Sequence, residues 1–246
     1  MTFYDSQLDI TEFTRFYLAA FYTFVAVFYI VKVLVNKHQN NRPSSEQAGI
    51  QLSTRHDSQL STQHDSQLNT QHNRLRENQK ELIFTGERFC STWWNHMTFR
   101  VFRSTIWVVC LARLFFPNVD DYLGLLFLSE SFSIVLLGNI LLTLGFMMTV
   151  IIHFKMGKQW RSGIDPSGPK KLITDGFYKF SRNPMFLSIA LSQFAFFLAL
   201  PSLFSLLCFI IGVIALYRQI QSEETHLLQQ FPEQYNIYST KVRRWL

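Results

Sequence analysis

Charged residues are scarce in this chain, and over long stretches they are missing altogether. Asp, Glu, Lys and Arg make up only 16% of the 246 residues, while 48% are hydrophobic. The apolar residues form uninterrupted blocks. In a water-soluble domain they would instead recur with the period of an amphipathic helix or strand. The mean hydropathy is only +0.08 because one very polar segment offsets these blocks. The composition therefore indicates an integral membrane protein.

Cysteine is also rare. The three cysteines, Cys90, Cys110 and Cys208, are far apart, with no CxxC pair and no metal-ligand spacing. The last two fall in apolar blocks and are interpreted as small apolar residues. Cys90 lies near a predicted membrane boundary, where lipidation is the alternative to an unmodified thiol. We therefore predict no metal site.

The net charge is +6, but its distribution argues against a nucleic-acid partner. Acidic residues dominate 1–15 and 117–130, whereas basic residues dominate 155–183 and the tail from Arg218 onward. Basic loops beside apolar spans orient membrane proteins, with the positive loops in the cytoplasm. The charge bias predicts an outer amino terminus and a cytoplasmic carboxyl terminus.

Apolar blocks predict where the chain crosses the membrane. Spans are expected at 16–35, 98–116, 131–154, 185–200 and 203–217. The last two form a hairpin around Pro201 and Ser202, and at 1.5 Å per residue each limb is only about 24 Å long. Such limbs are short for a bilayer core and need shelter from longer helices. The sequence thus predicts an all-α, polytopic membrane helical bundle of about five transmembrane helices with a short helical hairpin.

A polar insert follows the first span and contains a short repeat: STRHDSQL at 53–60, STQHDSQL at 61–68 and a weaker NTQHNRL at 69–75. Its histidines recur eight residues apart, whereas a helical two-histidine metal site needs a spacing of four. The predicted domains are a transmembrane segment at 1–35, a polar cytoplasmic insert with an interfacial helix at 36–97, and a transmembrane core at 98–246.

Arg113 is an unusual charge within the second span. Intramembrane charges are functional candidates by default. However, Arg113 lies within a turn of the outer end, near Asp120, Asp121 and Glu130. A structural ion pair, or snorkelling to the interface, is therefore expected.

Polar segments flank the hairpin on both sides, and the predicted topology places both at the cytoplasmic interface. Arg182 precedes the expected helix start at Asn183 and Pro184, where free amide groups attract anions, so it can clamp a carboxylate. Glu223 and Glu224 follow the second limb and can hold an ammonium, a sulfonium or ribose hydroxyls. The alternative is that these residues are interface anchors on a solvated helix face.

The stretch from about Gly157 to Leu246 resembles the isoprenylcysteine carboxyl methyltransferase family and its relatives, the phospholipid methyltransferases. The resemblance rests on four elements in order around the hairpin. They are GKQWRSGIDP at 157–166, LITDGFYKFSRNPMF at 172–186, EE at 223–224 and LLQQFPEQYNIYSTKVRRWL at 227–246. The closing element either folds back over the site or lies as an interfacial helix.

This resemblance implies S-adenosyl-L-methionine as the cofactor and assigns the residues that bind it. The matching positions are Leu172, Gly176, Phe177, Tyr178, Arg182, Asn183, Pro184, Phe186, Glu223 and Glu224. Asn183 stands in place of the family's usual histidine and Phe186 in place of its usual tyrosine, so the contacts made there are expected to differ. Cofactor-binding residues would thus lie at 157–246, facing the cytoplasm.

The resemblance also implies two catalytic residues. Arg218, five residues before Glu223, matches an arginine thought to orient the acceptor. A carboxylate acceptor is already ionised and needs no base, so Arg218 would steer it. An amine acceptor must lose a proton, for which Glu223 and Tyr217 are the candidates.

The predicted function is an integral-membrane, S-adenosylmethionine-dependent methyltransferase, with isoprenylcysteine-type carboxyl O-methylation placed first. Its partners would be membrane lipids and a lipophilic small-molecule or prenylated-protein acceptor. The alternatives are phospholipid amine N-methylation, a nicotinamide-dependent sterol-type reductase and a non-catalytic membrane scaffold. The reductase is disfavoured because the chain lacks the additional spans of those larger enzymes.

Overall fold

A computed structural model describes residues 3–40, 83–84, 90–157, 162–163 and 171–245 of the chain. The octapeptide repeats and the GKQWRSGIDP element lie largely or wholly outside these residues. The chain divides into two compact units, Met1–Thr23 with Ile83–Leu246, and Phe24–Leu82. Every predicted site residue belongs to the first unit.

The prediction of an all-α bundle is confirmed. The main helices are α1 (Phe3–Asn40), α4 (Ser91–Phe115), α5 (Phe132–Met156), α6 (Pro184–Ala199), α7 (Leu203–Gln230) and α8 (Pro232–Lys241). Short 3₁₀ helices lie at Pro117–Tyr122, Phe127–Glu130 and Gly176–Lys179. A two-residue strand, β1 (Ile83–Phe84), pairs in parallel with β2 (Ser162–Gly163).

Within the part of the chain that the structure describes, three helical stretches are long and apolar enough to cross a membrane: Ile10–Val31 of α1, the whole of α5 and the whole of α7. The α6 helix is apolar but has only 16 residues. The α4 helix has 25 residues, and Arg100, Arg103 and Arg113 interrupt its apolar character. The chain is therefore a helical membrane protein, and crossing by α4 and α6 stays a prediction.

The second limb of the hairpin is longer than predicted. It was expected to end at Tyr217, but α7 continues to Gln230. The reason is that 218–230 contains no glycine or proline and is rich in good helix formers, so the helix stops only before Phe231 and Pro232. Its 28 residues span about 42 Å, more than the roughly 30 Å of a bilayer core. Glu223 and Glu224 therefore lie on a rigid helix.

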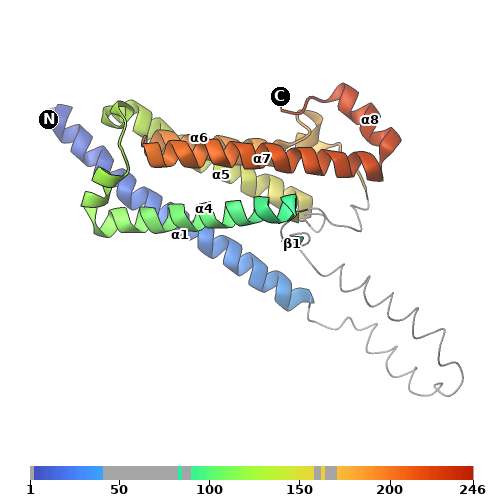
Figure 1. Ribbon diagram of the computed structural model, residues 1–246, viewed down its shortest axis with the longest axis horizontal. Helices are drawn as coiled ribbons and strands as arrows, with labels where there is room; N and C mark the ends of the chain where they lie inside the picture. The colour runs from blue at the N-terminus through green and yellow to red at the C-terminus, as the bar shows by residue number, and fades with distance from the viewer. Residues whose placement is uncertain (1–2, 41–82, 85–89, 158–161, 164–170, 246) are drawn as a thin grey trace, which may run out of the picture. The chain divides into compact units, whose positions relative to one another are not determined.

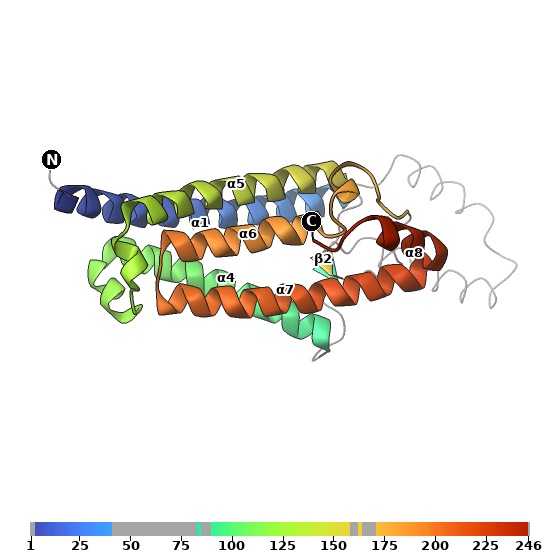
Figure 2. The ribbon, with the colours of Figure 1, turned by 90° about the horizontal axis from the view of Figure 1, so that it is seen from above.

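Small residues let α5 and α6 pack closely. A Cβ atom on Gly138 would lie 2.2 Å from the backbone nitrogen of Ala199, and one on Gly145 would also meet α6 at 2.5 Å. One turn further, Thr149 Oγ1 and Ser188 Oγ are 2.9 Å apart. Such contacts replace the hydrophobic driving force that is missing between helices in lipid. The helix that begins at the predicted site is thereby held firmly on α5, and Figure 2 shows α5, α6 and α7 running side by side.

The 117–130 connection holds the opposite end of the bundle. Leu126 N donates to Pro201 O and Leu203 N to Gly124 O, both at 2.9 Å, which fixes the hairpin turn. Gly124 has a φ of 63°, a left-handed conformation that favours glycine.

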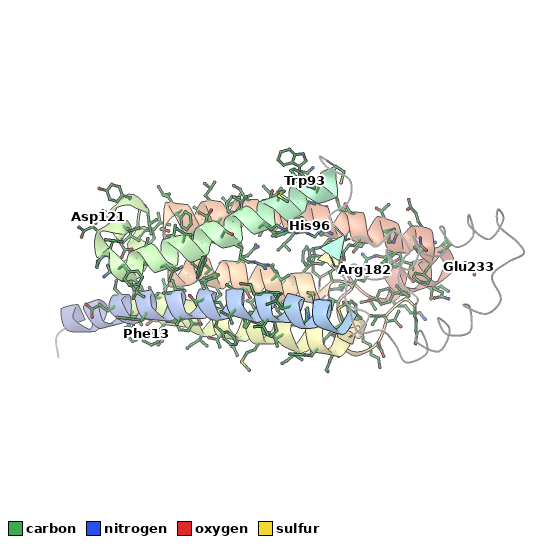
Figure 3. All side chains as sticks on the ribbon, turned by 90° about the horizontal axis from the view of Figure 1, so that it is seen from below. Phe13, Trp93, His96, Asp121, Arg182 and Glu233 are labelled. Carbon is green, nitrogen blue, oxygen red and sulfur yellow. The ribbon has the colours of Figure 1, made fainter. Side chains whose placement is uncertain are left out.

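The predicted ion pair of Arg113 is confirmed at this end. The buried Arg113 guanidinium pairs with Asp120, and Arg15 of α1 reaches the same carboxylate at 2.7 Å. Figure 3 shows the neighbouring Asp121 far from Arg182, which lies at the other end of the bundle. Arg113 therefore stabilises the fold at a distance from the predicted site.

Candidate functional site

The segment before α6 and the last turns of α7 meet at one end of the bundle. Asn183 is the residue directly before α6, whose first residue is the buried Pro184, and its side chain makes no capping bond to the helix. Asn183 Nδ2 donates to Glu224 Oε1 at 2.8 Å, and both residues are buried. The hairpin thus brings together two polar segments that are 41 residues apart.

Two arginines surround the Glu224 carboxylate. Arg244 Nε donates to both carboxylate oxygens at 3.2 Å, and its Nη2 donates to Oε2 at 2.9 Å. Arg182 Nη1 lies 3.8 Å from Oε2. The Glu224 side chain is only 10% exposed, so these charges interact in a poorly hydrated site.

The chain's last residues fold back over the site, which was one of the two alternatives for this element. Arg182 N donates to Arg243 O at 2.9 Å, and Ser181 Oγ donates to Arg244 O at 3.2 Å. Ser181 is almost completely buried, and its Oγ also accepts from Asn183 N. Backbone and side-chain bonds together attach the tail to 181–183.

A tyrosine cluster forms another side of the site. Tyr235 and Tyr238 of α8 pack with Leu172, and Tyr238 Oη donates to Tyr178 O at 2.7 Å. Burial raises the pKa of Tyr238 to about 12. Burial also raises the pKa of Tyr235, as does the nearby Glu224 carboxylate, while the Arg182 charge lowers it. Both hydroxyls therefore remain protonated donors at neutral pH.

Two buried polar atoms of the site, Arg182 Nε and Tyr235 Oη, meet no partner in good hydrogen-bond geometry among the residues that the structure describes, although the two side chains lie close enough for Arg182 to lower the pKa of Tyr235. The same holds for one acceptor, Gln219 Oε1 on α7. Buried polar groups in native proteins are nearly always satisfied, so such atoms are expected to take a ligand or water. The two donors suit an anionic group such as a carboxylate.

Glu223 lies in different surroundings from Glu224. Gln219 Nε2 donates to Glu223 Oε1 at 3.1 Å, and Glu223 is only half-buried. Burial raises the pKa of Tyr178, and the Glu223 charge raises it further. Glu223 is thus bonded to Gln219, whereas Glu224 is bonded to Asn183 and Arg244.

The other residues of the predicted cofactor set lie around this cluster. Gly176 has a φ of 60° at the start of its 3₁₀ helix, a conformation that favours glycine. Lys155 Nζ lies 4.6 Å from the centre of the Phe177 ring. Phe186 is half-buried on the first turn of α6.

Arg218 is not brought into the cluster. It is exposed on α7, and five residues of helix place it about 140° around the axis from Glu223. It therefore faces a different side of α7 from Glu223.

Sequence reasoning did not assign Ser181, Gln219 or the pairing of Arg244 with Glu224. The only signal for Ser181 was a serine just before Arg182 at a helix start. Among the residues that the structure describes, no group of His, Cys, Asp or Glu could hold a metal ion.

Comparison with known proteins places this region in a family. Residues 133–234 match the model described as phospholipid methyltransferase. The match runs from α5 into α8 and includes Arg182, Asn183 and Glu224, but it ends before Arg244. No curated protein and no solved structure matches the chain. The resemblance to membrane methyltransferases is therefore confirmed over these residues, without a choice between carboxyl and amine acceptors.

Proposed function

We propose that this protein, whose residues 133–234 belong to the phospholipid methyltransferase family, transfers a methyl group from S-adenosyl-L-methionine to a lipophilic acceptor at the membrane. One observation carries the proposal. The buried pair of Asn183 and Glu224 lies beside Arg182 where two apolar helices meet polar loops. A water-soluble cofactor and a lipid-soluble acceptor can approach such a place from different sides.

The residues present fit a zwitterionic cofactor. Arg182 Nε and Tyr235 Oη are buried donors that a carboxylate would satisfy. Glu224 is a buried carboxylate that can hold an ammonium or ribose hydroxyls. Asn183 fixes the orientation of Glu224 through its 2.8 Å bond.

The cofactor, when bound, supplies a methyl group on a positively charged sulfur; transfer breaks the sulfur–carbon bond, joins the carbon to the acceptor and leaves a neutral thioether. The chain's own residues mainly supply position and exclusion of water. Arg182 and Glu224 fix the two charged ends of one reactant. Leu172, Tyr235 and Tyr238 cover the site with apolar surface.

A carboxylate acceptor of the isoprenylcysteine type is our first candidate. It is already ionised at neutral pH, so no group on the protein has to remove a proton. Arg218, exposed on α7, would meet the acceptor as it arrives from the membrane interface.

A phospholipid amine is the second candidate, favoured by the position of Glu223. An amine must lose a proton during methylation, and Glu223, which accepts a hydrogen bond from Gln219, is a carboxylate next to Glu224 that Arg244 does not bind. We infer that the site faces the cytoplasm, as the basic loops predict.

Binding of radiolabelled S-adenosylmethionine to the full chain in nanodiscs tests the proposal. Arg182→Ala and Glu224→Gln should each weaken binding at least tenfold, because each removes a buried charged contact. Arg100→Ala, which removes an exposed charge on α4, is the control and should leave binding unchanged. Undiminished binding in both site variants would overturn the site. Nicotinamide dinucleotide binding in its place would favour the reductase, and binding of neither would favour the scaffold.

A further inference from the structure

The Glu224 carboxylate is fully occupied in this structure. A carboxylate offers about four acceptor positions. Oε1 accepts from Asn183 Nδ2 and Arg244 Nε, and Oε2 accepts from Arg244 Nε and Nη2. A ligand that uses Glu224 must therefore displace one of these two residues.

Arg244 is the partner that can leave. Its side chain is 35% exposed, whereas Asn183 is buried at the start of α6. Arg244 also lies beyond the end of α8 at Lys241, so it can move without unwinding a helix. Asn183 is less free to move, because it is buried at the start of a helix that packs closely on α5.

Charge considerations favour the same exchange. The Arg244 guanidinium is one positive charge bound to one buried carboxylate. Replacing it with the ammonium group of an amino-acid cofactor leaves the charge of the site unchanged and keeps the bond from Asn183. Loss of Arg244 without replacement would leave Glu224 with Asn183 and the more distant Arg182, which is costly for a buried charge.

We propose that the carboxyl-terminal segment 242–245 is a displaceable strap, in which Arg244 occupies Glu224 until the cationic group of S-adenosylmethionine replaces it. This inference rests on the proposed function, since it concerns the same site. The strap is held by the bonds of Arg243 O and Arg244 O to 181–183 together with the Arg244–Glu224 pair. Because the cofactor binds only the open state, its apparent affinity is reduced by the fraction of molecules in which the strap is open.

A pair of single substitutions tests the strap. Arg244→Ala should tighten S-adenosylmethionine binding about three- to tenfold, the size expected for loss of a partly exposed competing ion pair. Arg243→Ala is the matched control. It also removes one positive charge from the strap but keeps the Arg243 carbonyl that accepts from Arg182 N, so the affinity should not change. Weaker binding in Arg244→Ala would overturn the strap, because it would mean that Arg244 holds Glu224 in place for the cofactor.

A second measurement needs no substitution. Trypsin cleaves after arginine, so the tail of the wild-type protein should be cut faster at Arg244 when S-adenosylhomocysteine is saturating, as followed by intact mass. The exposed Lys241 at the end of α8 gives an internal reference cut in the same sample. Protection of Arg244 by the ligand would contradict the strap.

The two proposals fail in different ways. If Arg182→Ala and Glu224→Gln bind S-adenosylmethionine like the wild type, the proposed site is wrong. If those two variants lose binding while Arg244→Ala shows no gain and ligand does not speed cleavage, the site stands and the strap is wrong.

Discussion

Asn183 Nδ2 donates to Glu224 Oε1 across 2.8 Å, and this bond connects the start of α6 to the last turns of α7. The sequence resemblance implies histidine at this position in related methyltransferases. An amide and a neutral imidazole can each present one N–H to a carboxylate, so the replacement preserves the bond to Glu224.

The effect of substituting Asn183 on cofactor affinity should therefore depend on whether the new side chain can donate a hydrogen bond to Glu224. Asn183→His should bind S-adenosylmethionine within about threefold of the wild type, because the N–H donor is kept. Asn183→Asp should lose more than tenfold, because a second buried carboxylate would face Glu224. Equilibrium binding checks both variants, and equal affinity of the Asp and His variants would contradict a donor role.

Asp120 holds the far end of the bundle together. Arg113 and Arg15 share its carboxylate, and Arg113 is buried. Asp120→Asn should destabilise the protein by about 3 kcal/mol, because it leaves a buried guanidinium without a counter-charge. Thermal unfolding in detergent measures this, with the exposed Asp121→Asn as a matched control. Cofactor affinity should not change, and a large change would mean that the two ends are coupled.

The same ion pair predicts a pH dependence. Burial raises the pKa of Asp120, but hydrogen bonds and charge from Arg113 and Arg15 outweigh this and hold its pKa below the ordinary value. A lowered pKa means that the stabilisation is complete above the pKa of the unfolded chain, about 4, and disappears as the pH falls through the lower folded value. The difference in melting temperature between wild type and Asp120→Asn should be constant from pH 5 to 8 and shrink below about pH 4. A difference that grows toward acid pH would contradict this assignment.

Close packing of α5 on α6 predicts a steric effect. Gly138→Ala places a methyl group where the backbone of Ala199 already lies, 2.2 Å from the new carbon. The helices must separate, and overpacking of this kind costs about 1–3 kcal/mol. The melting temperature in detergent should fall, while Leu144→Ala, on the exposed side of α5, should have little effect. Equal melting temperatures for wild type and Gly138→Ala would show that α5 and α6 are not in contact there.

The sequence predicted the parts of this structure that follow from local chemistry and connectivity. Apolar blocks located the helices, Pro184 marked the start of α6, and the hairpin placed Asn183 near Glu224. The length of α7 was missed because its last turns are polar, and polarity was interpreted as the end of the helix although no residue there breaks one. The bonds of Arg244 to Glu224 and of Arg15 to Asp120 were missed for another reason. Each joins segments that approach only after folding, 105 residues apart in the second case.

Glu223 offers a way to distinguish the two acceptor classes. If the acceptor is a phospholipid amine, Glu223→Gln removes the base that takes its proton, and the rate of methylation should fall by about a hundredfold or more. If the acceptor is a farnesylcysteine-type carboxylate, no proton has to be removed, and the same variant should keep its rate within about threefold. Product mass spectrometry with phosphatidylethanolamine vesicles and with an amine-blocked farnesylcysteine measures both reactions on one protein.

Gln219→Leu is the companion variant, because Gln219 Nε2 orients Glu223 at 3.1 Å without carrying charge. With an amine acceptor, the methylation rate of Gln219→Leu should fall less than that of Glu223→Gln, because the base is still present. Alkaline pH should restore part of the lost rate, because hydroxide can also take the proton of the amine. With a carboxylate acceptor neither variant should change the pH profile. A loss in Glu223→Gln that is equal for both acceptors would show that Glu223 binds the cofactor and is not the base.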